Sequence, residues 1–163
     1  MKTKEEIFDT LISDELGVLR AAAYRILGNP AEVDEVVQEA LIKAWNKFDQ
    51  FHGEAKLSSW VYRITVNLSC DRIRKNKRET EKLKSYAESC ATDAECHENG
   101  ALGALAEAIA ELPELYRDAI LIGVLGDFAA PEAASVLSCS INTMYQRIYK
   151  AKQLLREKLE VTA

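Results

Sequence analysis

The stretch Pro131–Leu159, PEAASVLSCSINTMYQRIYKAKQLLREKL, decides the fold because it predicts a helix, a tight turn and a second helix. Pro131 suits the first turn of a helix, where its missing N–H is not needed. The predicted turn is Ser138-Cys139-Ser140, and Ser140 is a suitable N-cap. Two helices joined in this way are a compact device for reaching the major groove of duplex DNA.

The second helix of this pair has an apolar and a polar face. The predicted core stripe recurs at steps of three and four residues and consists of Ile141, Met144, Ile148, Ala151 and Leu155. The candidate DNA contacts are the polar side chains Asn142, Thr143, Gln146, Arg147 and Lys150. Such side chains suit base edges and phosphates. The alternative for the same pattern is a solvated amphipathic helix of an all-α domain.

The composition predicts a helical protein. The 163 residues include only 7 glycines and 3 prolines, with 48% hydrophobic and 29% charged residues, which is ordinary for a soluble globular chain. No apolar run approaches the roughly 18 residues that span a bilayer, and Met1–Glu6 precedes no apolar signal core. We therefore expect a cytoplasmic protein without membrane insertion, and reduced cysteines.

Charge is distributed in blocks along the chain. The net charge is −5, which alone argues against DNA binding. Residues 63–84, however, carry eight Lys or Arg and three Asp or Glu, a net +5, whereas residues 85–116 carry seven Asp or Glu and no Lys or Arg, a net −7. Because the local field governs binding to a polyanion, residues 63–84 are a candidate nucleic-acid surface.

Three helices are predicted in the first half. Residues 5–27 form the first, which ends at Gly28-Asn29-Pro30. Residues 31–48 form the second, with a buried stripe of Val33, Val36, Val37, Ala40, Leu41, Ala44, Trp45 and Phe48. Ser58 or Ser59 caps the third, which reaches about Lys82 and whose polar face carries Arg63, Asn67, Asp71 and Arg74.

Aromatic residues lie beside the basic helix, namely Phe48, Phe51, Trp60 and Tyr62. Aromatic and cationic side chains together suit unpaired bases, with stacking worth roughly 1–3 kcal/mol per base. For most of the area of Trp45 and Trp60, core packing is the better interpretation. A solvated helix end is the alternative for Arg72–Arg78.

These stretches, taken in order, resemble a bacterial sigma factor of the extracytoplasmic-function (ECF) group of the sigma-70 family. Glu32–Trp45, EVDEVVQEALIKAW, is similar to the helix that binds core polymerase, and Phe51–Asn67, FHGEAKLSSWVYRITVN, resembles the −10 recognition loop and melting helix. Leu112–Leu121 resembles the start of the −35-binding domain and Leu154–Leu159 its closing helix. The resemblance covers nearly the whole chain.

The resemblance implies an all-α fold of two small helical domains joined by a flexible linker. Residues 1–84 would be the sigma region 2 domain of three to four helices, 85–103 an acidic linker, and 104–163 the region 4 helix-turn-helix domain. Partners would be core RNA polymerase, promoter DNA and an anti-sigma factor. The polymerase would supply the chemistry, so we expect no enzymatic activity, cofactor or metal.

The resemblance also assigns site residues. The implied core-polymerase contacts are Glu35, Gln38, Glu39 and Ile42. The implied −10 contacts are His52, Gly53, Glu54, Ala55, Lys56, Trp60, Arg63, Asn67 and Arg74, with His52–Lys56 framing a pocket for a flipped base.

Two departures from the family pattern concern the −35 reader. Phe128–Ala134 replaces the usual Leu-Ser-aromatic-Glu-Glu-Ile-Ala, and Tyr145 stands where Lys is common. Losing one phosphate-facing cation would reduce the salt slope of binding by about one. Cys90, Cys96 and His97 could form a redox or metal sensor. The two cysteines are spaced more widely than the pairs of a common zinc site, so we favour an unstructured segment.

Two other functions fit parts of the sequence. A helix-turn-helix regulator that acts without polymerase would leave Glu32–Trp45 and Phe51–Trp60 unexplained. A helical protein-binding module would follow if the departures in the −35 reader had abolished DNA contacts.

Overall fold

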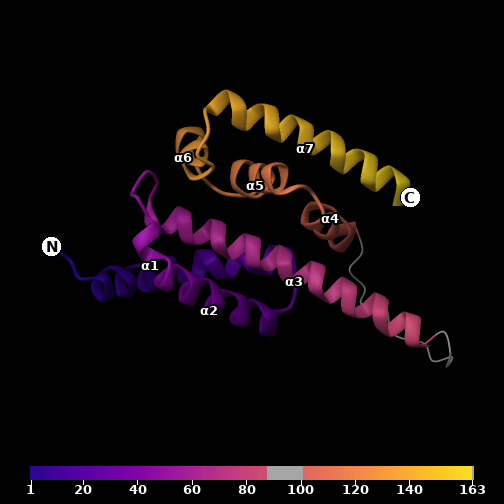
Figure 1. Cartoon of the computed structure of the whole chain (residues 1–163), viewed down its shortest axis with the longest axis horizontal. Helices are drawn as coiled ribbons and strands as arrows, with labels where there is room; N and C mark the ends of the chain where they lie inside the picture. Colours follow the sequence, from indigo (N-terminus) through magenta and orange to yellow (C-terminus); the bar gives the residue numbers. More distant parts are fainter. Residues whose placement is uncertain (88–100, 163) are drawn as a thin grey trace.

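The computed structural model describes residues 1–87 and 101–162, and every regular element within these ranges is helical. The elements are α1 (Lys4–Leu27), α2 (Pro30–Asn46), the 3-10 helix η1 (Phe48–Gln50), α3 (Leu57–Ala87), α4 (Ala101–Ala110), α5 (Glu114–Gly123), α6 (Ala130–Val136) and α7 (Ile141–Thr162). We call α1–α3 the first unit and α4–α7 the second unit. In Figure 1 the second unit lies above the first, along α3. The prediction of an all-α fold is confirmed.

Local capping explains where the first helices begin and end. The Thr3 side chain and the Glu6 side chain form a capping box at the start of α1. Gly28 ends α1 in the left-handed region, with φ of 66°, which glycine adopts without steric cost. Asn29 then caps α2 and Pro30 occupies its first turn.

The first unit is a three-helix core. The predicted stripe of α2 is buried at Val33, Val36, Val37, Ala40 and Ala44, whereas Leu41, Trp45 and Phe48 are half-buried. Phe8 of α1 packs edge-on against Trp45 and Phe48, with ring centroids 5.0 and 5.6 Å apart. The prediction that most of the Trp45 side chain packs in the core is therefore confirmed.

The helix-turn-helix of the second unit is present. Ser140 accepts a hydrogen bond from the Thr143 N–H at 3.1 Å, so the predicted N-cap is confirmed. Four residues of the predicted core stripe are buried, namely Met144, Ile148, Ala151 and Leu155. Ile141 is 39% exposed, so its predicted burial is wrong. It is the first residue of α7.

Helix α3 starts earlier and ends later than predicted. The Trp60 N–H already bonds to the Lys56 carbonyl, so neither Ser58 nor Ser59 is the N-cap. Ser59 is fully buried and its hydroxyl instead donates to Glu132 of the second unit at 2.6 Å. Helices α3 and α4 each extend three residues into the range predicted as a linker, 85–103. Cys90, Cys96 and His97 lie outside the described residues.

Residues 1–87 and 101–162 include neither a candidate membrane span nor a candidate metal site. No helix there is long and apolar enough to cross a membrane. The same ranges contain no group of three or more His, Cys, Asp or Glu side chains that could hold a metal ion.

The first-unit core generates a stability prediction. Leu19→Ala should lower the free energy of unfolding by about 2–5 kcal/mol, because Leu19 is 1% exposed and its removal leaves a cavity. Val18→Ala is the matched control on the next residue, 51% exposed, and should change it by no more than about 0.5 kcal/mol. Urea unfolding of both variants measures the difference, and equal losses would contradict the packing described.

Candidate nucleic-acid and polymerase interfaces

Helix α2 presents one exposed stripe opposite its buried one. Glu35, Gln38, Glu39 and Ile42 are all exposed, and Ile42 leaves 61% of its surface accessible. Their spacing of three and four residues puts them along one face of α2. The predicted core-polymerase contacts are therefore brought together, as an acidic surface with an apolar side chain at one end.

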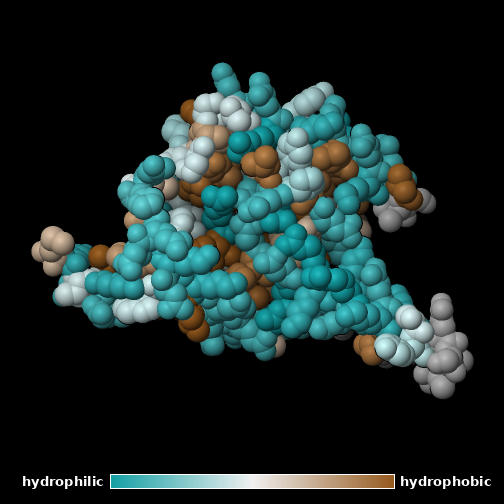
Figure 2. Space-filling model, in the orientation of Figure 1, coloured by the Kyte–Doolittle hydropathy of each residue, from teal (hydrophilic) through white to brown (hydrophobic). Residues whose placement is uncertain are grey.

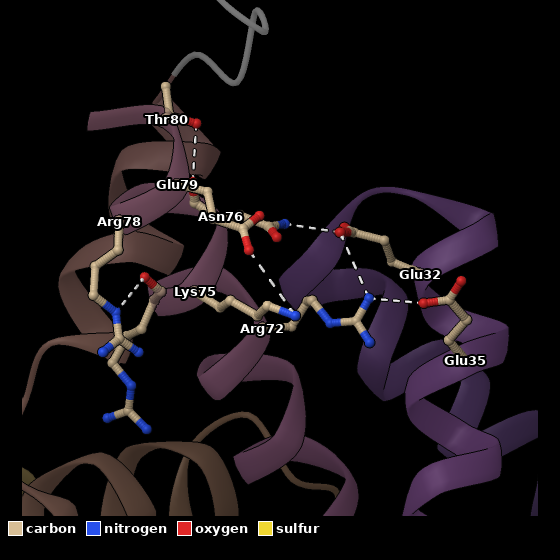
Figure 3. A network of polar contacts seen from close by, with 9 residues as sticks. Glu32, Glu35, Arg72, Lys75, Asn76, Arg78, Glu79 and Thr80 are labelled. Atoms are coloured by element: carbon tan, nitrogen blue, oxygen red, sulfur yellow. Dashed lines mark hydrogen bonds and ion pairs between the residues drawn. The ribbon is translucent and has the colours of Figure 1, made fainter. Parts of the chain in front are cut away.

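A polar network fastens this surface to α3 (Figure 3). The Arg72 guanidinium lies between two carboxylates of α2, 2.8 Å from Glu35 and 4.0 Å from Glu32. Asn76 donates to Glu32 at 2.8 Å. The hydrogen bond to Glu35 raises the pKa of Arg72 above its usual value. Arg72 is half-buried in this bridge, so neither the solvated helix end nor a freely available cation describes this position.

The loop between η1 and α3 holds the predicted −10 pocket residues. His52, Gly53, Glu54 and Lys56 are exposed, whereas Ala55 is half-buried. Gly53 has a φ of 75°, which turns the loop at a position that other residues would occupy under strain. Trp60 is half-buried against Phe51, with ring centroids 5.4 Å apart.

The polar face of α3 contacts the second unit instead of solvent. Arg63 donates from Nε and Nη2 to the Asp118 carboxylate, at 3.1 and 2.7 Å, and from Nη1 to the Val136 carbonyl at 3.0 Å. Asn67 accepts a hydrogen bond from Arg117 at 3.3 Å. The predicted −10 contacts Arg63 and Asn67 thus share one face, as expected, but both are engaged within the chain.

Arg74, farther along α3, also contacts the second unit. Its guanidinium donates to the Ala110 carbonyl at 3.2 Å and pairs with Asp71 one turn earlier. Lys77, on the next turn, hydrogen-bonds to Glu111, which also accepts from Lys158 of α7 at 2.9 Å. The hydrogen bond from Lys77, followed by that from Lys158, lowers the pKa of Glu111. Arg74 and Lys77 of the predicted basic surface therefore contact the second unit, and Lys77 is paired with its carboxylates.

Helix α7 carries the predicted −35 contacts on an outward face. Asn142, Gln146 and Lys150 are exposed at successive four-residue steps. Thr143 and Arg147 are half-buried, and the Thr143 hydroxyl shares a 2.8 Å hydrogen bond with Ser140. Tyr145 and Tyr149 project from the same helix, 55% and 67% exposed. The sequence analysis did not consider Tyr149, although its four-residue spacing from Tyr145 was visible.

A cavity of about 270 Å³ lies where the two predicted DNA-reading surfaces meet. Its lining includes Arg63, from the −10 set, and Arg147, from the −35 set. Asp118, with 3% of its surface exposed, also lines it, and one of its carboxylate oxygens receives no hydrogen bond from the described residues. Sequence reasoning missed Asp118 and Arg117, although two charged residues directly before Ala119-Ile-Leu-Ile122 were a signal that α5 buries charge.

Comparison with known proteins identifies the class. Sigma-70 region 2 matches residues 11–79 and Sigma-70, region 4 matches residues 102–155. The chain is 30% identical to the ECF RNA polymerase sigma-E factor of Escherichia coli K12, over 79% of this chain and 74% of that protein. It is 29% identical to the ECF RNA polymerase sigma factor SigW of Bacillus subtilis, over 97% of this chain and 91% of that protein.

A solved structure that is similar to this chain also belongs to a sigma factor. The sigma factor RpoE of Bartonella quintana, crystallised in complex with the anti-sigma factor NepR, has a TM-score of 0.51 and 29% identity over 96% of this chain and 98% of that one. The protein is thus a sigma factor of the sigma-70 type, a class of non-enzymatic transcription initiation factors. More particularly, it belongs to the ECF RNA polymerase sigma factors. Membership in this family disfavours both alternative functions, a helix-turn-helix regulator that acts without polymerase and a helical protein-binding module.

Proposed function

We propose that this ECF sigma factor binds core RNA polymerase through the exposed stripe of α2. The observation that carries the proposal is the separation of α2 into a largely buried stripe and an exposed stripe of Glu35, Gln38, Glu39 and Ile42. An exposed isoleucine at one end of an acidic stripe suits a partner with an apolar contact and cationic side chains beside it. Arg72 orients the stripe by holding Glu35 at 2.8 Å.

The first unit then reads the −10 element, with residues 1–84 as the functional domain. Arg63, Asn67 and Arg74 would contact the upstream edge, and the loop His52–Lys56 with Trp60 would hold the flipped base. Extruding a base costs a few kcal/mol of stacking, which contacts in the pocket must offset. The half-buried pair Phe51 and Trp60, 5.4 Å apart, supports this role because part of each ring remains accessible for stacking.

The second unit, residues 104–163, reads the −35 element through Asn142, Thr143, Gln146, Arg147 and Lys150. Three of these side chains are exposed on one stripe of α7, which suits insertion into a major groove. The acidic segment 85–103 joins the two units. Tyr145, at 55% exposure on the same helix, would replace the usual cation with an apolar contact.

An anti-sigma factor is the proposed regulator, as in the Bartonella complex. Figure 2 shows apolar side chains gathered over the helices of the second unit, on a face that is otherwise mainly hydrophilic. The exposed large side chains of the second unit include Leu115, Leu125 and Tyr149, at 57%, 38% and 67%. The chain itself would catalyse no reaction, carry no cofactor and act in the cytoplasm.

Polymerase binding is tested by the double variant Gln38→Ala/Ile42→Ala. Its affinity for core polymerase should fall tenfold or more, on the order of 1.4 kcal/mol or above, because an exposed apolar side chain and its neighbour would be lost from the interface. Asp14→Ala/Val18→Ala is the matched control, since both residues are exposed and four residues apart on α1. Equal affinities for the two double variants would place the docking surface elsewhere.

The −35 assignment is tested with the polymerase complex at fixed salt concentration. Arg147→Ala should weaken binding to a promoter by roughly 5–150-fold, about 1–3 kcal/mol, and should have little effect once the −35 element is scrambled. Lys152→Ala removes the same charge from an exposed position farther along α7 and should weaken both DNAs alike. If Arg147→Ala weakens both DNAs equally, Arg147 contacts phosphate and does not read bases.

A further inference from the structure

Helix α7 carries one large side chain within its proposed DNA-reading face that the proposed −35 contacts do not include. Tyr149 is 67% exposed and follows Gln146 by three residues and Asn142 by seven. At about 3.6 residues per turn, it therefore lies about 60° from Gln146 and about 20° from Asn142 around the helix axis. A groove that admits Asn142 and Gln146 to its base edges also admits the ring of Tyr149.

The hydroxyl of this ring is held from the same helix. The side-chain amide of Gln153, one turn farther along α7, donates to the Tyr149 hydroxyl at 3.3 Å. This contact needs no other element, so the ring keeps its orientation when α7 enters a groove. A side chain that is ordered before binding loses less conformational entropy on binding than a free one.

The chemistry of the ring indicates which base it would meet. Asn142 and Gln146 present amide donors and acceptors, whereas the Tyr149 ring presents an apolar surface. In the major groove every base pair offers hydrogen-bonding groups, but thymine alone offers a methyl group, at C5. Contact between the ring and this methyl group removes apolar area of both from water, which is favourable. Guanine or cytosine at the same place would put polar edges against the apolar part of the ring without hydrogen bonds.

We propose that Tyr149 is a specificity-determining residue of this sigma factor and selects thymine at one position of the −35 element through the thymine methyl group. The inference rests on the proposed −35 function of α7, and it adds an apolar, base-specific contact to a set of polar ones. Tyr145 does not share this role, because it lies about 100° from Gln146 around the helix axis, at the edge of the face. Its contact there falls on the sugar–phosphate backbone, which is the same in every sequence.

The test uses the full chain in complex with core RNA polymerase, and promoter DNA whose −35 positions are randomised, at one salt concentration. Selection by the wild type should enrich thymine at one position. Selection by Tyr149→Ala should lose this enrichment and keep the preferences at the other positions, since Asn142, Gln146 and Lys150 are unchanged. Because Tyr149 is exposed, the substitution removes no core packing.

Uracil in place of that thymine isolates the methyl group, because uracil forms the same base pair and lacks only the methyl. In a fixed duplex this replacement should lower the affinity of the wild type about fourfold, the effect of burying one methyl-sized group. Tyr149→Ala should bind the thymine and uracil duplexes equally, whereas Tyr149→Phe keeps the ring and should keep the preference. Tyr145→Ala is the matched control at an exposed position one turn earlier, and should weaken binding to both duplexes by the same factor.

Three outcomes are decisive. A thymine preference that Tyr149→Ala abolishes and Tyr145→Ala preserves supports the assignment. No enrichment of thymine by the wild type, or the same loss on uracil in the wild type and in Tyr149→Ala, overturns the assignment, and the proposed function stays intact if scrambling the −35 element still weakens binding. If scrambling that element leaves the affinity of the wild type unchanged, the proposed −35 function fails, and the assignment with it.

Discussion

Helix α3 packs against the core of the first unit on one side and against the second unit on the other. The rest of the structure depends on this constraint. One side of the helix supplies Val61, Val66 and Cys70 to the core of the first unit, all with 2% exposure or less. The other side carries Arg63 and Arg74, which bond to the second unit. Burial is strong enough on the first side to raise the pKa of the Cys70 thiol to about 12, so Cys70 stays protonated and unreactive near neutral pH.

The two sides of α3 have different physical consequences. Water does not compete for the apolar packing of the first unit, so this packing fixes the position of the exposed stripe of α2, which carries the proposed polymerase contacts. The polar contacts between the units are of a kind that phosphate could also make, because carboxylate, carbonyl and phosphate groups all offer acceptor oxygens to guanidinium groups.

Most of the fold could be predicted from local sequence patterns. Contacts between residues far apart in the sequence could not. The buried stripe of α2 and the Ser140 cap follow from spacing within one helix, and both are present. The bond between Arg63 and Asp118 joins residues 55 positions apart, and no periodicity indicates it. For the same reason the predicted site residues could be grouped by face, whereas their engagement by the second unit, and the bridging role of Arg72, required the structure.

The most direct test of the account is the distance between the two units, measured by pulsed electron paramagnetic resonance with labels at Ser13 of α1 and Lys152 of α7, both exposed. Introducing the labels as unnatural amino acids leaves the native cysteines in place. The account predicts one narrow, short distance in the free chain and a clearly longer one in the complex with core polymerase. The same distance in both states, or a broad distribution in the free chain, would contradict it.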